Sequence, residues 1–153
     1  MDNKITKILF LCHGNICRSP MAEFILKDMV RKAGLEGRFV IDSAAVSDEE
    51  WGNPIYPPAQ ACLRRHGIPF DDHRAHKVSL AEYQGYDFAP VMDAQNLRWL
   101  KRIVGEIPDG KSPRMMQFAG QERDVADPWY TDDFETTYRD LVLSCGALLD
   151  YLT

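Results

Sequence analysis

A short apolar run near the N-terminus does most to constrain the fold of this chain. Residues 8–11 (ILFL) have the length and composition of a buried strand, and Gly14 and Asn15 break the pattern soon after it. Residues 19–29 then carry apolar side chains at helical spacing. They begin with Ser-Pro, and proline is favoured in the first turn of a helix because its missing N–H is no loss there. The chain therefore begins with a strand, a loop and a helix.

The same alternation continues along the chain. Residues 38–45 predict a second strand, which follows the first helix and completes a strand–helix–strand unit. Residues 86–92 predict a third strand, although Asp87 and Pro90 interrupt its pattern, and residues 115–118 predict a weaker fourth. Strands separated by helices form parallel sheets that helices cover on both faces. We therefore expect an α/β protein with a four-stranded parallel sheet.

Three more helices are predicted between and after these strands. Residues 59–66 have a helical pattern that a glycine ends, and Asp93 can cap a helix that carries apolar residues from Leu97 to Val104. The last helix is the clearest, with Asp132 as its expected cap. Its apolar residues share one face: Phe134, Tyr138, Leu141, Val142, Cys145, Leu148, Leu149 and Leu152.

Length and composition narrow the class of protein. A chain of 153 residues is the size of one domain, so residues 1–153 are predicted to form a single domain. The formal net charge of −5 argues against a nucleic-acid partner, whose binding surface would be basic. No apolar run approaches the roughly 18 residues of a membrane span, and no export signal is recognisable. We therefore expect a cytoplasmic protein with reduced cysteines and no membrane partner.

The loop of residues 12–18 (CHGNICR) joins the features that an attack on a phosphate ester needs. Cys12 is a nucleophile at the carboxyl end of a strand, where parallel sheets bind their ligands. The loop can turn its N–H groups inward around an anion, with Gly14 expected to relieve the steric limits on the turn. The following helix points its positive end at the same place, and Arg18 offers a planar fork that matches two phosphate oxygens.

The pattern Cys-x5-Arg is weak by itself, since a chain of this composition would contain it by chance about 0.3 times. Its place between a strand and a helix, with Gly14 inside it and Ser19 after it, makes it much more specific. From the residues of the loop alone, the alternative is a buried cysteine in an ordinary turn between strand and helix.

The run from Leu11 to Glu23 closely resembles the signature of the low-molecular-weight protein tyrosine phosphatases. The resemblance covers nearly the whole chain and implies a flavodoxin-like, doubly wound α/β fold (phosphatase I-like), without a metal and without an organic cofactor. Further segments resemble family segments in family order: residues 42–45, 52–54, 65–69, 92–97 and 127–136.

The resemblance implies a set of catalytic residues. Cys12 would form a phosphocysteine intermediate in the hydrolysis of phosphotyrosine and other aryl phosphomonoesters, Arg18 would bind the phosphate, and Asp127 would be the general acid. Pro128 disfavours a helical conformation for the residue before it, which agrees with an extended loop at Asp127. The expected substrate is a tyrosine-phosphorylated protein, with inhibition by phosphate, vanadate and similar oxyanions, and the expected state is a monomer or a weak self-associate.

The resemblance also implies supporting residues around the catalytic ones. Ser43 and His73 match a network that holds Asn15, and Cys17 matches a redox partner that can form a reversible disulfide with the oxidised nucleophile. Ser19 can donate to Cys12 when the thiolate leaves. Residues expected to contact the substrate are His13, Gly14, Asn15, Ile16, Cys17, Ser19, Trp51, Trp129 and Tyr130.

Three positions at the expected rim depart from the family pattern. Glu49 stands where an aromatic residue is common, and Trp51 can replace it if that loop is strand-like, because a two-residue offset preserves the facing. Tyr56 is followed by two prolines where charged residues are common, and His76 stands where an arginine is usual. The chemistry is expected to survive, whereas these positions leave the substrate preference open.

Three other functions compete with phosphotyrosine hydrolysis. The same mechanism can act on phosphoarginine or on a small phosphomonoester. A thiol-dependent arsenate reductase has a similar loop but needs two further cysteines, and this chain has none between Gly67 and Ser144. A non-catalytic phosphoanion-binding protein is expected to lack the nucleophile or the acid, and both are present.

Overall fold

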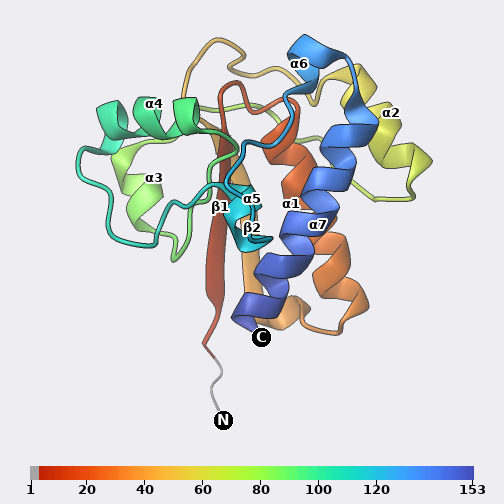
Figure 1. The fold of residues 1–153 in the computed structure, drawn as a ribbon, viewed down its shortest axis with the longest axis horizontal. Coiled ribbons are helices and arrows are strands. Elements are labelled where there is room, and N and C mark those ends of the chain that lie inside the picture. Colours follow the sequence, from red (N-terminus) through yellow and green to blue (C-terminus); the bar gives the residue numbers. More distant parts are fainter. Residues whose placement is uncertain (1–3) are drawn as a thin grey trace.

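The computed structural model describes residues 4–153. Strand β1, Thr6–Cys12, runs through the middle of the fold (Figure 1). It pairs in parallel with β2, Phe39–Ala45, so that Thr6 lies opposite Phe39 and Cys12 opposite Ala45. Helix α1, Arg18–Lys32, and the short 3-10 helix Glu36–Arg38 connect the two strands. The predicted strand, loop, helix and second strand are confirmed.

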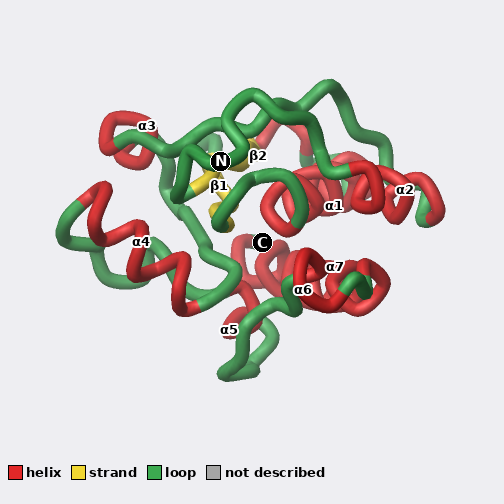
Figure 2. Tube along the Cα trace, turned by 90° about the horizontal axis from the view of Figure 1, so that it is seen from above, coloured by secondary structure: helices red, strands yellow, loops and turns green. Residues whose placement is uncertain are grey.

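Side chains of β1 point alternately into two hydrophobic cores. Ile8 and Phe10 pack in the core shared with α1 and with α7, Phe134–Leu152. Leu9 and Leu11 pack in a smaller core with α3, Leu80–Gln84, and α4, Ala94–Val104. Figures 1 and 2 show α3 and α4 on one side of the strands and α1 and α7 on the other. Because both faces of β1 are covered, its sequence is apolar without interruption.

The third predicted strand runs beside β1 without becoming regular. Leu9 N donates to Phe88 O at 2.9 Å and Leu11 N donates to Pro90 O at 2.9 Å, which gives isolated parallel bridges. Pro90 has no N–H to return a bond to β1. The N–H of Met92 instead donates to the Asn96 side chain at 3.1 Å. The segment is therefore extended and hydrogen-bonded, but the ladder is broken at alternate positions.

The predicted fourth strand at residues 115–118 is wrong, because Met115–Phe118 forms the short helix α5. A four-residue apolar run cannot by itself distinguish a strand from a buried helical turn. Arg114 N donates to the Gln117 side chain at 2.9 Å, which favours the turn. The extended segment lies just before it, where Val91 N donates to Pro113 O at 2.9 Å. Among residues 4–153, β1 and β2 are the regular strands, and single bridges add the other two segments.

The remaining helices are α2 and α6, which are both short. Helix α2, Pro57–Arg65, begins two residues before the predicted 59 because two prolines occupy its first turn. Helix α6, Pro128–Thr131, precedes α7. The predicted cap of α7 is wrong by one residue: Asp133 accepts from Thr136 N at 3.0 Å, while Asp132 adopts a left-handed conformation. In the described part of the chain, no helix is long and apolar enough to cross a membrane.

Candidate active site

The loop of residues 12–18 connects the carboxyl end of β1 to the first turn of α1, and its peptide planes share an orientation. The carbonyls of Cys12, His13 and Ile16 accept from the N–H groups of Val46, Ser47 and Tyr56 at 3.0, 3.2 and 2.9 Å. In a trans peptide the N–H points away from the carbonyl of the same plane. The N–H groups of His13, Gly14 and Cys17, which follow these carbonyls, therefore point away from these partners and are available to an anion.

Asn15, rather than Gly14, adopts the backbone conformation that makes the turn. Its φ is 61°, a left-handed conformation that asparagine tolerates better than most residues. The expectation that Gly14 relieves the turn is therefore wrong. A Cβ at Gly14 would come within 3.2 Å of the Glu50 side chain, which would have to shift slightly to admit a larger residue.

The side chain of Asn15 holds the loop in this conformation through three neighbours. Its amide nitrogen donates to Ser19 Oγ at 2.8 Å and to Ser43 Oγ at 3.0 Å, and its oxygen accepts from His73 Nε2 at 3.0 Å. Ser43 in turn donates to Glu23 Oε1 at 2.6 Å. Burial lowers the pKa of His73, which favours the neutral ring. The predicted group of Asn15, Ser43 and His73 is thus brought together.

Cys12 lies at the floor of the site with its thiol 2.9 Å from Ser19 Oγ. The N–H of Asn15 also donates to this sulfur, at 3.2 Å. Because Ser19 Oγ already accepts a hydrogen bond from Asn15, its own proton can point at Cys12. Two hydrogen-bond donors therefore face the Cys12 sulfur. The Cys12 residue is 3% exposed, so access to it is through the pocket alone.

The guanidinium of Arg18 links the loop to the two acidic residues across the site. It donates to Asp93 Oδ2 at 2.9 Å, to Asp127 Oδ2 at 3.3 Å and to the backbone carbonyl of Val125 at 3.1 Å. Burial alone would lower the pKa of this guanidinium, but the charges of Cys12 and of the two carboxylates outweigh it and raise the pKa. Arg18 is therefore a fixed cation beside the thiol.

Asp127 projects into the site from an extended residue before α6, as Pro128 predicted. Its Oδ1 accepts from Trp129 N at 3.0 Å, which caps the short helix. Its Oδ2 is left facing Arg18. A group that binds the Arg18 fork from the pocket would compete for this contact and free Asp127.

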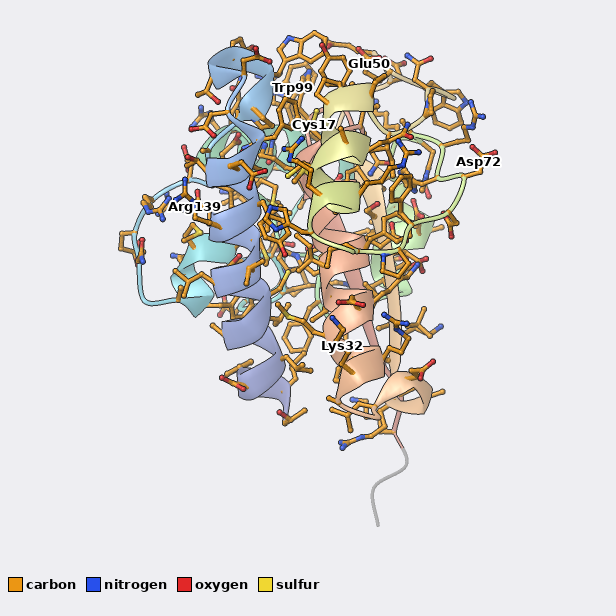
Figure 3. The ribbon with its side chains drawn as sticks, turned by 90° about the vertical axis from the view of Figure 1, so that its right-hand side faces the viewer. Cys17, Lys32, Glu50, Asp72, Trp99 and Arg139 are labelled. Carbon is orange, nitrogen blue, oxygen red and sulfur yellow. The ribbon has the colours of Figure 1, made fainter. Side chains whose placement is uncertain are left out.

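These residues surround one pocket of about 370 Å³. Figure 3 shows Cys17, Glu50 and Trp99 at the end of the molecule opposite Lys32, near the start of α1. The exposed rings of Trp129 and Tyr130 stand at its mouth, and Tyr130 is 84% exposed. The lining residues are Cys12, His13, Gly14, Asn15, Ile16, Cys17, Arg18, Glu49, Glu50, Asp93, Gln95, Asn96, Trp99, Asp127, Trp129 and Tyr130.

Two expected contact residues, Ser19 and Trp51, do not line the pocket. Ser19 is fully buried and reaches the site through its contacts with Cys12 and Asn15. Trp51 lies outside the pocket on an exposed loop. Its side chain is 63% exposed and lies edge-on to His76, with ring centroids 6.5 Å apart. The loop is a series of turns rather than strand-like, with Trp51 N donating to Asp48 O at 3.2 Å and Gly52 at a φ of 83°. The two-residue offset therefore does not preserve the facing. Glu49 lines the wall instead, with His13 Nε2 at 3.0 Å from its carboxylate.

Several residues of the site were not predicted as such from the sequence. Asp93 was expected only as a helix cap. Its position directly after the extended segment of residues 86–92 could have indicated a site residue, because ligands bind beyond the carboxyl ends of parallel strands. Trp99 lies on α4, with its ring 5.3 Å from that of His13. Nothing in the sequence pattern distinguishes Trp99 or Glu50 from ordinary surface residues. Glu23 supports the loop through Ser43 and through His73, whose Nδ1 lies 3.7 Å from its Oε1, and long-range folding creates both contacts.

Comparison with known proteins agrees with this geometry. The family model described as low molecular weight phosphotyrosine protein phosphatase matches residues 7–153. The low molecular weight protein-tyrosine-phosphatase YfkJ of Bacillus subtilis is 39% identical over 144 residues, covering 93% of this chain and 92% of that protein. The low molecular weight phosphotyrosine protein phosphatase of Gallus gallus is 38% identical over 152 residues, covering 96% of each.

Solved structures give the same grouping. The crystal structure of YfkJ superposes with a TM-score of 0.94 at 36% identity, covering 99% of this chain and 97% of that chain. The Drosophila arginine phosphatase DARP superposes with a TM-score of 0.88 at 28% identity, covering 97% of this chain and 98% of that chain. The chain therefore belongs to the low molecular weight phosphotyrosine protein phosphatase family.

Proposed function

We propose that the protein hydrolyses phosphotyrosine in proteins through a phosphocysteine on Cys12. The observation that carries the proposal is the convergence of three groups on one pocket: the Cys12 thiol at its floor, and Arg18 paired with Asp127 at its wall. A nucleophile, an oxyanion-binding cation and a proton donor are what a two-step phosphoryl transfer requires.

In the first step, the Cys12 thiolate attacks phosphorus and the bond to the tyrosine oxygen breaks. Arg18 and the loop N–H groups bind the phosphoryl oxygens, and Asp127 gives its proton to the leaving oxygen. In the second step, a water molecule attacks the phosphocysteine and gives its proton to the Asp127 carboxylate. The sulfur leaves as a thiolate, which accepts the hydrogen bond from Ser19.

The aromatic rim supports an aryl substrate. Trp129 and Tyr130 offer ring faces at the pocket mouth, and Tyr56 packs against Trp129 with ring centroids 5.1 Å apart. A phenyl ring entering the pocket gains contact with these rings, whereas the short side chain of phosphoserine does not reach them. An aromatic contact of this kind contributes about 1 kcal/mol, which corresponds to roughly a five- to tenfold preference.

A panel of substrates tests this proposal directly. We expect the highest kcat/KM for phosphotyrosine peptides, about five- to tenfold lower values for matched phosphoserine peptides, and no thiol-dependent reduction of arsenate. Phosphoarginine is the alternative substrate. We consider it less favoured, because the relatives with higher sequence identity are named as tyrosine phosphatases. A phosphoarginine peptide cleaved faster than its phosphotyrosine counterpart would reverse this assignment while leaving the phosphocysteine mechanism intact.

Other properties follow as proposals from the same site. We infer a reducing, cytoplasmic location, because the mechanism needs Cys12 as a free thiol. Phosphate and vanadate should inhibit, because they match the anion that the loop and Arg18 bind. We also infer that the protein acts as a monomer or weak self-associate.

We propose that the fold contains a four-stranded parallel sheet, in which the extended segments of residues 86–92 and 111–114 are the third and fourth strands.

Peroxide should inactivate the enzyme reversibly through a disulfide between Cys12 and Cys17, which line the same pocket. Oxidation of the Cys12 thiolate to a sulfenic acid allows the Cys17 thiol to displace water and form the S–S bond. Burial raises the pKa of Cys17, so Cys17 stays protonated until it reacts. Peptide mapping after treatment checks this, with recovery of activity under thiol reductants. Over-oxidised Cys12 beside a reduced Cys17 would contradict it.

A further inference from the structure

A second cluster of chemically reactive side chains lies outside the pocket, where α2 packs beside the start of α7 (Figures 1 and 3). Cys62 and His66 are four residues apart at the C-terminal end of α2 and share one helical face. Glu135, in the first turn of α7, reaches the same place. One ligand atom from each residue lies within 4.8 Å of the others. We propose that these three residues bind a zinc ion.

The donor set fits zinc better than the common hard cations. A thiolate, an imidazole and a carboxylate are the three ligand types that zinc takes in proteins, whereas calcium and magnesium prefer oxygen ligands alone. His66 Nε2 lies 2.7 Å from Glu135 Oε2, and Cys62 Sγ lies 3.8 Å from Glu135 Oε1. Small side-chain adjustments would give each atom its bond of about 2.0–2.3 Å to a shared ion. Three protein ligands leave the fourth tetrahedral position to water.

Neighbouring groups already orient each of the three side chains. The His66 ring stacks on the ring of Tyr138, with centroids 3.7 Å apart and planes at 10°. Arg65 donates twice to Glu135 Oε1, at 3.0 and 2.7 Å, so a cation would bind Oε2 in place of its present contact with His66 Nε2. Cys62 is fully buried, with its thiol directed at Phe134 O at 3.7 Å. Such partners, which hold the ligands from behind, accompany protein metal sites.

Without a metal, the three side chains form an ion-pair network between two helices. Release of a proton on metal binding distinguishes a zinc site from such a network. A cysteine thiol without a metal carries its proton at neutral pH, because its ordinary pKa is about 8.5. Binding must replace the S–H bond by a sulfur–zinc bond and release that proton. His66 must also present a lone pair at Nε2, which now faces the Glu135 carboxylate. Arg65 and Tyr138 face the cluster as well and keep their protons. A salt-bridge network alone would take up no metal and release no proton.

Cobalt is a suitable probe, because a cobalt–thiolate bond gives a charge-transfer absorption that oxygen and nitrogen ligands alone do not give. The titration uses the full chain carrying Cys12→Ser, so that the active-site thiol cannot bind the probe. We expect a saturable band that zinc displaces, proton release in calorimetry of zinc binding, and a zinc-dependent rise in Tm.

Variants of the cluster decide the assignment. In the Cys12→Ser background, Cys62→Ser should abolish the band, and His66→Gln should weaken cobalt binding at least about tenfold while keeping the buried thiol. Cys145→Ser is the matched control and should leave the band unchanged, since Cys145 is equally buried and its sulfur faces the carbonyl of Ala22 at 3.7 Å rather than the cluster. If Cys62→Ser fails to fold, His66→Gln decides alone. Absence of a saturable band, or a band that survives both cluster variants, would overturn the proposal.

Discussion

The Cys12→Ser variant should lose turnover by at least about 10³-fold while it still binds phosphate or vanadate. The hydroxyl of serine is a far weaker nucleophile than a thiolate, and Cys12 is the sulfur that the donors of Ser19 and Asn15 face. Oxyanion binding depends on Arg18 and the loop N–H groups, which the substitution leaves in place. Turnover of an aryl phosphate and vanadate binding by calorimetry measure the two quantities separately.

Cys145→Ser is the control for this experiment, because Cys145 is buried in the core shared by α1 and α7, away from the pocket. It should keep its turnover. Residual activity of Cys12→Ser above about a thousandth of the wild-type rate would mean that another group attacks phosphorus. Loss of vanadate binding together with turnover would mean that the substitution has disturbed the loop rather than removed a nucleophile.

Local sequence patterns sufficed for β1, α1 and the loop between them. Each has its own signal: an apolar run buried on both faces, a Ser-Pro helix start, and a loop whose cysteine and arginine point at one anion. For Asp127, the following proline predicted the extended backbone, whereas its expected role came from the family resemblance. These residues are close in sequence to the elements that position them, so little long-range information was needed.

Local hydrogen bonding, a tight turn and one long-range contact explain what the sequence patterns missed. The N–H of Met92 is taken by the Asn96 side chain, and Pro90 has no N–H, so a segment with a strand pattern does not form a regular strand. Trp51 was expected to line the pocket because a strand-like loop was assumed. Gly52 instead turns the chain, and Glu49 lines the pocket wall. Asp93 enters the site only because Arg18, 75 residues away in sequence, reaches it.

The Asp127→Asn variant should slow poor leaving groups far more than good ones. If Asp127 protonates the leaving oxygen, phenyl and alkyl phosphates should react roughly 10²–10⁴-fold more slowly, whereas a nitrophenyl phosphate should be affected less. Asparagine keeps an oxygen that can accept from Trp129 N, so the cap of α6 is preserved. It also removes the charge that competes for Arg18, so vanadate should bind at least as tightly as in the wild type. Rates across a series of leaving groups, plotted against leaving-group basicity, measure the effect.

The pH profile of the same variant tests the role of Asp127 independently. Wild-type kcat/KM should be bell-shaped, because Cys12 must be ionised while Asp127 is protonated, with an optimum at about pH 5–6. The alkaline limb reports loss of the proton from Asp127, so it should vanish in Asp127→Asn and persist in the control Asp132→Asn. Asp132 is exposed and left-handed, a conformation that asparagine tolerates, so this control changes charge near the site without strain. If Asp127→Asn slowed all leaving groups equally and kept its alkaline limb, Asp127 would not be the acid. Asp93, the other carboxylate that Arg18 contacts in the pocket, would then be the next candidate.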